Sequence, residues 1–268
     1  MSCGVTAHAD WESYAPFWIR KCREGEANRE GMLDDWMLKT LGSVAGLKIV
    51  DLGCGEGRFC RILSRLGASN VLGIDSCERL ILEARKQCTS DVERYIVGNI
   101  ENLDSVESCS FQVAVSYVTL VDVLNLDAVS RSTYRVLDPG GRFVACNLAP
   151  MATSANERIG EPDGSRVAIR VDNYFDESTR VMRFRGGHRL KGFHRTLSTH
   201  VNAFLKTGFV LRGIHEPLPT TEGIGRYPEL MNELRAPSFV IFDLKKPAHQ
   251  ASNLPGQLTG HPESPESC

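Results

Sequence analysis

Three glycines and two acids are the residues of this chain whose spacing most directly indicates chemistry. The stretch I-V-D-L-G-C-G-E-G contains Asp51, Gly53, Gly55 and Gly57, and the later apolar stretch V-L-G-I-D ends in Asp75. A strand, a glycine-rich turn, a helix and a second strand that ends in an acid form the unit with which Rossmann-like domains bind nucleosides. The glycines let the backbone approach a ligand closely. Asp75 follows Gly57 by 18 residues, where a carboxylate can accept hydrogen bonds from both ribose hydroxyls.

The glycine turn fits a nicotinamide dinucleotide poorly. That site favours G-x-G-x-x-G, and here Arg58 occupies the position of the third glycine. Asp51 beside the turn would repel a pyrophosphate, whereas it suits a ligand with a cationic amino-acid end. S-adenosylmethionine carries an ammonium and a sulfonium and no phosphate, so we expect it to be the cofactor. A nicotinamide-dependent oxidoreductase remains an alternative.

The glycine motif also resembles a known family. Residues 50–57 match V-D-L-G-C-G-x-G, the first motif of the class I S-adenosylmethionine-dependent methyltransferases, and residues 135–141 resemble its R-V-L-x-P-G-G signature. The resemblance is to the small-molecule type, similar to ubiquinone and menaquinone biosynthesis enzymes with a methyltransferase type 11 domain. It implies an α/β fold: a Rossmann-like doubly wound seven-stranded sheet with an antiparallel last strand and an inserted cap hairpin. It also implies S-adenosyl-L-methionine as the cofactor.

The resemblance assigns roles to residues around the turn. The three glycines, with Cys54 between them, would pass under the methionine portion of the cofactor, and Asp51 would lie near its ammonium. Asp75 would hold the ribose. Ser76 is included among the cofactor residues and is also the predicted N-cap of the next helix.

Residues 98–101, G-N-I-E, resemble the family's third motif, usually G-D-A-E, which lines the adenine. Asn99, Ile100 and Glu101 are therefore expected at the adenine, although the first two depart from the usual residues. The Asn99 amide oxygen can still accept from the adenine amine; a simple turn before a helix is the alternative. Tyr117 ends a predicted strand and either packs against the cofactor or is an ordinary strand-end aromatic.

Candidates for acceptor chemistry lie at the N-terminus and in a basic segment. Tyr14 lies in the segment W-x-x-Y-A, which resembles the N-terminal lid helix of small-molecule members. It would close over the sulfonium, and simple packing within the helix is the alternative. Residues 180–195 contain six basic residues, two histidines and no acid. His188 or His194 is a candidate general base or hydrogen-bond donor, and the run suggests an anionic acceptor such as a carboxylate. A solvated basic face is the alternative.

These residues require alternating strands and helices to position them. Apolar periodicity and turn signals predict two helices over 8–42. After them, strands and helices alternate along the chain, which predicts a parallel sheet. The expected strands are 47–51, 70–75, 95–97, 111–117, 142–147, 209–215 and 238–244, and the expected later helices are 58–66, 77–88, 125–137 and 197–206. We therefore divide the chain into lid helices (1–45), cofactor-binding core (46–147), substrate-cap insertion with a small hairpin (148–196), the rest of the core (197–246) and a disordered tail (247–268).

Composition excludes several classes of function. The net charge of −2 gives no electrostatic footprint for nucleic acid, and we expect no membrane insertion, because no apolar run approaches the ~20 residues needed to span a bilayer. The start lacks a secretory signal pattern, and nine scattered cysteines without C-x-x-C predict reduced thiols, a cytoplasmic location and no zinc site. Asp122 alone does not make the carboxylate cluster of metal-dependent members. A small-molecule acceptor is expected, and a non-catalytic S-adenosylmethionine-binding protein remains an alternative.

Overall fold

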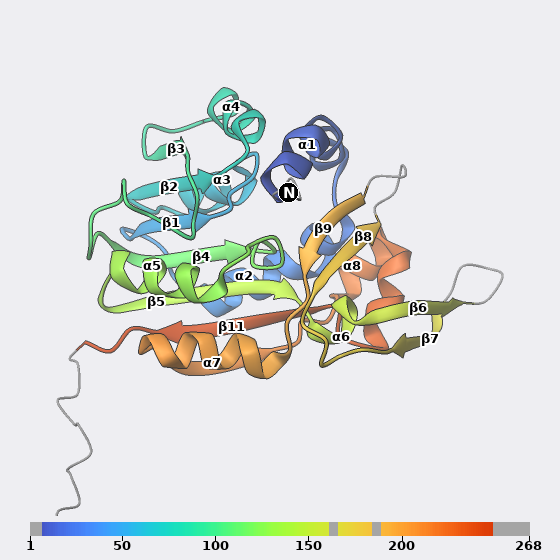
Figure 1. The fold of residues 1–268 in the computed structure, drawn as a ribbon. Coiled ribbons are helices and arrows are strands. Elements are labelled where there is room, and N and C mark those ends of the chain that lie inside the picture. The colour runs from blue at the N-terminus through green and yellow to red at the C-terminus, as the bar shows by residue number, and fades with distance from the viewer. Residues whose placement is uncertain (1–6, 161–165, 184–188, 249–268) are drawn as a thin grey trace, which may run out of the picture.

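A seven-stranded sheet forms the centre of the molecule. The computed structural model describes residues 7–160, 166–183 and 189–248. The strand order is β10-β11-β5-β4-β1-β2-β3, and β11 pairs antiparallel with both of its neighbours, whereas the pairs from β5 to β3 are parallel (Figure 1). The predicted doubly wound sheet with an antiparallel last strand is therefore confirmed. The strands are β1 (Lys48–Leu52), β2 (Asn70–Asp75), β3 (Glu93–Val97), β4 (Phe111–Tyr117), β5 (Leu137–Leu148), β10 (Val210–His215) and β11 (Phe239–Lys245).

Helices cover both faces of this sheet, because successive strand residues point to opposite sides. Ile49 joins one buried cluster, with residues of α2 (Asp34–Leu41), α3 (Arg58–Arg65) and α4 (Glu78–Lys86). Val50 joins a second cluster, with residues of α5 (Leu126–Val136) and α7 (Leu197–Thr207). The near-continuous apolar strands are thus buried on both faces, as a parallel sheet requires.

The N-terminal segment differs in detail from the two predicted helices. It contains α1 (Ala7–Glu24), a π-helical turn η1 (Arg29–Leu33) and then α2. The π-turn lies against α8 (Thr221–Arg226) and the 3₁₀ turn η2 (Pro228–Leu234), two short helices that the sequence pattern did not predict. The contact is close: a Cβ at Gly223 would lie 2.0 Å from the Gly31 carbonyl oxygen. Glycine is therefore required where these two segments meet.

The insertion after β5 contains more structure than the single hairpin expected. A short helix α6 (Pro150–Thr153) precedes two separate antiparallel hairpins, β6 (Ala155–Gly160) with β7 (Arg166–Val171) and β8 (Thr179–Arg183) with β9 (Arg189–Phe193). Strand β9 reaches back to the core, since Phe193 N–H donates to the Val121 carbonyl over 2.6 Å. Lys191 N–H donates to Asp10 of α1 over 3.4 Å. Figure 1 shows β9 beside the N-terminal helix, and the two elements contact each other.

Within the described ranges, none of the helices is long and apolar enough to cross a membrane. Residues 249–268, which make up most of the predicted tail, lie outside the described residues.

Candidate cofactor and active site

The glycine turn after β1 has a backbone that side chains do not tolerate. Gly53, Gly55 and Gly57 have φ values of +77°, +57° and +78°, in the left-handed region. A Cβ at Gly53 would lie 2.1 Å from the Thr119 side chain, and a Cβ at Gly57 would lie 2.7 Å from the Tyr95 ring. Gly55 is different, because the nearest atom to such a Cβ is 3.9 Å away. The outer glycines are required by protein contacts, and the middle one leaves the backbone open to a ligand.

Asp75 lies at the carboxyl end of β2, beside this turn. Its Oδ2 accepts from Gly55 N–H over 2.9 Å, and its Oδ1 accepts from Cys77 N–H over 2.8 Å. Burial raises the pKa of the Asp75 carboxyl, and these two hydrogen bonds oppose the rise. The prediction that Ser76 caps α4 is wrong: Cys77 is the N-cap residue, and the Asp75 carboxylate supplies the local acceptor.

Asp51 lies beneath the turn with one oxygen unsatisfied. The side chain is 1% exposed, its Oδ2 accepts from the Cys60 thiol over 3.2 Å, and its Oδ1 has no hydrogen-bond partner. Burial raises the pKa of Asp51 to about 7. A small pocket brings this carboxyl together with other predicted cofactor residues; it is lined by Arg29, Asp51, Gly53, Cys54, Arg58, Phe59 and Tyr117.

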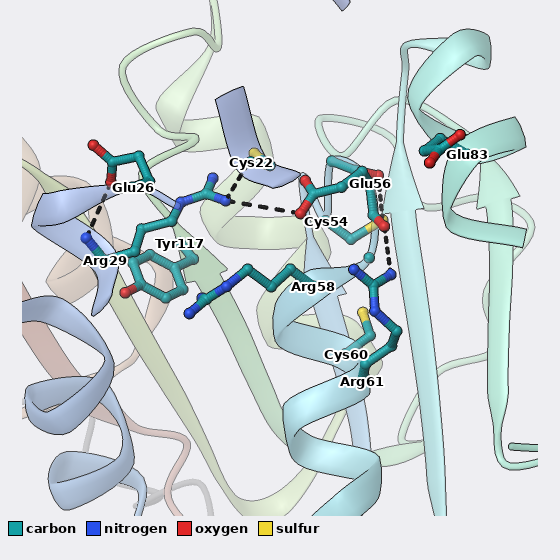
Figure 2. A network of polar contacts seen from close by, with 12 residues as sticks. Cys22, Glu26, Arg29, Cys54, Glu56, Arg58, Cys60, Arg61, Glu83 and Tyr117 are labelled. Carbon is teal, nitrogen blue, oxygen red and sulfur yellow. Dashed lines mark hydrogen bonds and ion pairs between the residues drawn. The ribbon is translucent and has the colours of Figure 1, made fainter. Parts of the chain in front are cut away.

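Arg29 is a pocket residue that the sequence motifs did not identify. Its guanidinium stacks over Trp18 at 4.6 Å and Tyr117 at 5.7 Å and lies 3.9 Å from Glu56 Oε1 (Figure 2). Burial disfavours the charged form, but Glu56 raises the pKa of Arg29 above its ordinary value, so the group stays cationic. Arg29 begins the π-turn η1, and π-turns occur frequently at functional sites. No residue pattern around it signals this position.

Tyr117 lies at the other side of the pocket, at the end of β4. The ring is 7% exposed and packs edge-on against Phe59 at 4.9 Å. Its hydroxyl donates to Asp34 over 2.9 Å, and Asp34 also receives two hydrogen bonds from Arg58. Val118, the next residue, has φ of +60°, an unusual conformation for a β-branched residue. The chain therefore turns sharply away from the sheet at the pocket.

The residues expected at the adenine are mainly engaged with the protein. Asn99 Oδ1 accepts from Glu101 N–H over 2.9 Å, Ile100 is 6% exposed in the core, and Asn99 itself is exposed. Glu101 Oε1 accepts from the backbone of Leu124 and Asn125 over 2.7 and 3.0 Å. The three residues follow β3 at the carboxyl edge of the sheet, Glu101 holds the loop after β4, and none of the three lines the pocket described above.

The three candidates for acceptor chemistry have different locations. His194 is 1% exposed, its Nε2–H donates to the Tyr174 carbonyl over 2.8 Å, and its Nδ1 lies 2.6 Å from the Thr153 hydroxyl. With both nitrogens engaged, this ring has no site for an acceptor proton, and the structure does not bring it to the pocket. His188 lies outside the described residues. Tyr14 is 1% exposed within an aromatic cluster of α1, and burial raises its pKa to about 12.

The residues at the turn fit S-adenosylmethionine. Its zwitterionic amino-acid end needs an acceptor and a cation, and the unsatisfied Asp51 oxygen and the Arg29 guanidinium line the same pocket. Gly55 follows the pocket residue Cys54, donates its N–H to Asp75 and leaves its backbone open. Among the residues that the structure describes, no group of three or more His, Cys, Asp or Glu is arranged to hold a metal ion.

Comparison with known proteins agrees with this chemistry. Residues 50–145 match a family described as a methyltransferase domain. The chain is 30% identical to an S-adenosylmethionine dependent methyltransferase from Mesorhizobium loti; the two structures align with a TM-score of 0.72 over 83% of this chain and 99% of that one.

Two curated enzymes match a shorter part. Malonyl-[acyl-carrier protein] O-methyltransferase of Pectobacterium atrosepticum is 32% identical over 48% of this chain and 49% of its own length. Demethylmenaquinone methyltransferase of Tropheryma whipplei is 34% identical over 41% and 46%. The chain spans about half the length of these two relatives. It belongs to the class I small-molecule S-adenosylmethionine-dependent methyltransferases, and S-adenosylmethionine is its cofactor.

Proposed function

We propose that the chain transfers a methyl group to a small-molecule acceptor by in-line displacement, with its own residues acting mainly by positioning. When bound, S-adenosylmethionine supplies a methyl group already activated by the sulfonium. The chain then needs to orient the two reactants and exclude water. The observation that carries the proposal is the convergence of Asp51, Arg29 and the open Gly55 backbone beside Asp75.

Each group has a defined task in this proposal. Asp75 accepts from the ribose hydroxyls in addition to its two backbone donors. The unsatisfied Oδ1 of Asp51 accepts from the cofactor ammonium, which compensates a buried oxygen that otherwise lacks a partner. Arg29 binds the cofactor carboxylate, because a planar guanidinium matches a carboxylate in two parallel hydrogen bonds.

Two peripheral segments complete the site. We propose that residues 1–45 form a lid and residues 148–196 a cap over the acceptor. The contacts of β9 with Asp10 and Val121 support this, because they join the cap to the lid helix and to the loop after β4. Closure of these segments would exclude water from the transferring methyl group.

Titration calorimetry with S-adenosylhomocysteine and adenosine tests the cofactor site. Asp75→Asn keeps an acceptor for one backbone N–H, so we expect the variant to fold. We also expect both ligands to bind at least tenfold more weakly, since both carry the ribose. Asp104→Asn, at an exposed loop acid, is the matched control. Binding of NADH but not of S-adenosylhomocysteine would refute the proposal, and S-adenosylhomocysteine formation with an acceptor panel separates an enzyme from a non-catalytic binder.

A further inference from the structure

The loop that follows β4 is held in place from several sides. Arg195 is 8% exposed and donates to three backbone carbonyls of residues 120–124, at 2.6 to 3.2 Å. Val121 N–H donates to Asn147 Oδ1 over 3.0 Å, and its carbonyl accepts from Phe193 N–H. The loop is therefore a fixed element, and a side chain that it presents has a defined position.

Asp122 is the ionisable side chain at the centre of this loop, and one of its oxygens has no partner. Trp11 lies close enough to favour the charged form of the carboxyl, whereas the Oδ1 atom is buried without a hydrogen bond. Burial raises the pKa of Asp122 to about 8, and the charge of Asp75 adds to the rise. A buried oxygen without a partner is costly. A ligand that brings a hydrogen-bond donor would remove this cost.

Aromatic rings connect Asp122 to the cofactor turn. Trp11 lies edge-on to Tyr14 at 5.5 Å and to Trp18 at 5.9 Å. The Trp18 indole nitrogen lies 3.9 Å from the position that a Cβ on Gly55 would take, so this cluster extends from the loop acid to the open glycine. A carboxylate next to aromatic rings is the combination that recognises amines and ammonium ions.

Two guanidiniums of the basic segment are engaged within the protein. Arg180 pairs with Asp176 at 3.3 Å and with neighbouring backbone carbonyls, and Arg195 is committed to the loop carbonyls. Neither guanidinium is available to an anionic acceptor.

We propose that Asp122, Trp11, Tyr14 and Trp18 form the acceptor subsite and that the acceptor is an amine. This inference rests on the proposed function. The acceptor enters as an ammonium and gives one proton to Asp122 Oδ1. The freed nitrogen lone pair forms the bond to the methyl carbon as the carbon–sulfur bond breaks, so the positive charge passes from sulfur to the methylated nitrogen.

Indole NMR of the whole chain saturated with S-adenosylhomocysteine tests the subsite without turnover. The chain has three tryptophans, and a Trp11→Phe variant assigns the Trp11 signal. Benzylamine, benzyl alcohol and benzoate serve as probes of similar shape and different charge. We expect benzylamine to shift the Trp11 signal and the other two to leave it unchanged. Asp122→Asn should weaken the benzylamine response at least tenfold, and Asp127→Asn, an exposed acid nearby, should not change it.

Each other outcome overturns the inference. If benzoate or benzyl alcohol shifts the Trp11 signal as much as benzylamine does, the subsite does not prefer amines. If benzylamine does not shift the Trp11 signal, the proposed acceptor subsite is refuted. An unchanged response in Asp122→Asn removes the role of this carboxyl. S-adenosylhomocysteine binding, measured on the same samples, separates failure of the acceptor inference from failure of the proposed function. If S-adenosylhomocysteine binds but benzylamine gives no response, only the acceptor inference is overturned. If S-adenosylhomocysteine does not bind, the proposed function is overturned as well.

Discussion

Replacing Arg29 by Met tests whether this guanidinium recognises the amino-acid end of the cofactor. Met keeps much of the apolar stem of the side chain but removes the charged guanidinium that stacks on Trp18. A hydrogen bond to a charged group contributes about 1.5–3 kcal/mol. Its loss corresponds to a roughly 10- to 150-fold higher Kd for S-adenosylhomocysteine. Arg29→Lys, which keeps the charge but not the planar fork, should give an intermediate loss.

The assay compares two ligands by titration calorimetry. 5′-Methylthioadenosine shares the nucleoside and the sulfur with S-adenosylhomocysteine but lacks the amino-acid end. We expect Arg29→Met to weaken S-adenosylhomocysteine selectively and to leave 5′-methylthioadenosine nearly unchanged. Equal loss for the two ligands would refute the reasoning, because Arg29 would then act by shaping the pocket.

Glu56 provides a control for stability. Without Arg29 the buried Glu56 carboxylate loses its nearby cation, so the single variant should unfold at lower urea concentration. The double variant Arg29→Met, Glu56→Gln should recover this stability but not the affinity for S-adenosylhomocysteine. Recovery of both would show that the affinity loss came from the unpaired acid.

Three further predictions concern stability and are measured by urea unfolding. Gly53→Ala should lower the free energy of unfolding by about 2–5 kcal/mol, since it combines a left-handed φ with overlap against Thr119; an unchanged midpoint would contradict this. Burial raises the pKa of Asp51 to about 7, so the folded state keeps a proton that the unfolded state releases, and stability should fall as pH rises from about 4 to 7. Asp51→Asn should reduce the dependence of the free energy of unfolding on pH. An unchanged dependence would refute its assignment to Asp51. His194→Ala should lower the free energy of unfolding by about 1–3 kcal/mol, because it leaves the Tyr174 carbonyl unpaired. The affinity for S-adenosylhomocysteine should not change, and a large loss of affinity would show that the His194 ring belongs to the site.

Local patterns predicted the core elements closely. Strands at 70–75 and 111–117 have the observed bounds, and the helix expected over 197–206 is α7, which ends at Thr207 before Gly208, with φ of +106°. These elements depend on apolar periodicity and on glycine conformations, which are properties of short segments. The π-turn at Arg29 and the short helices after Thr220 were not predictable in this way, because the close approach of Gly31 and Gly223 stabilises them.

The sequence alone determined the cofactor chemistry of this protein. The glycine turn, Asp51 and Asp75 come from one continuous strand–turn–helix–strand unit, so their spacing along the chain determines their spacing in the fold. Only the tertiary structure decided which other side chains share the site. Arg29 reaches the pocket through a π-turn, the loop that carries Asp122 is held by Arg195, and His194 is engaged by Tyr174 and Thr153. Each of these depends on contacts between segments far apart in the sequence, which no local pattern encodes.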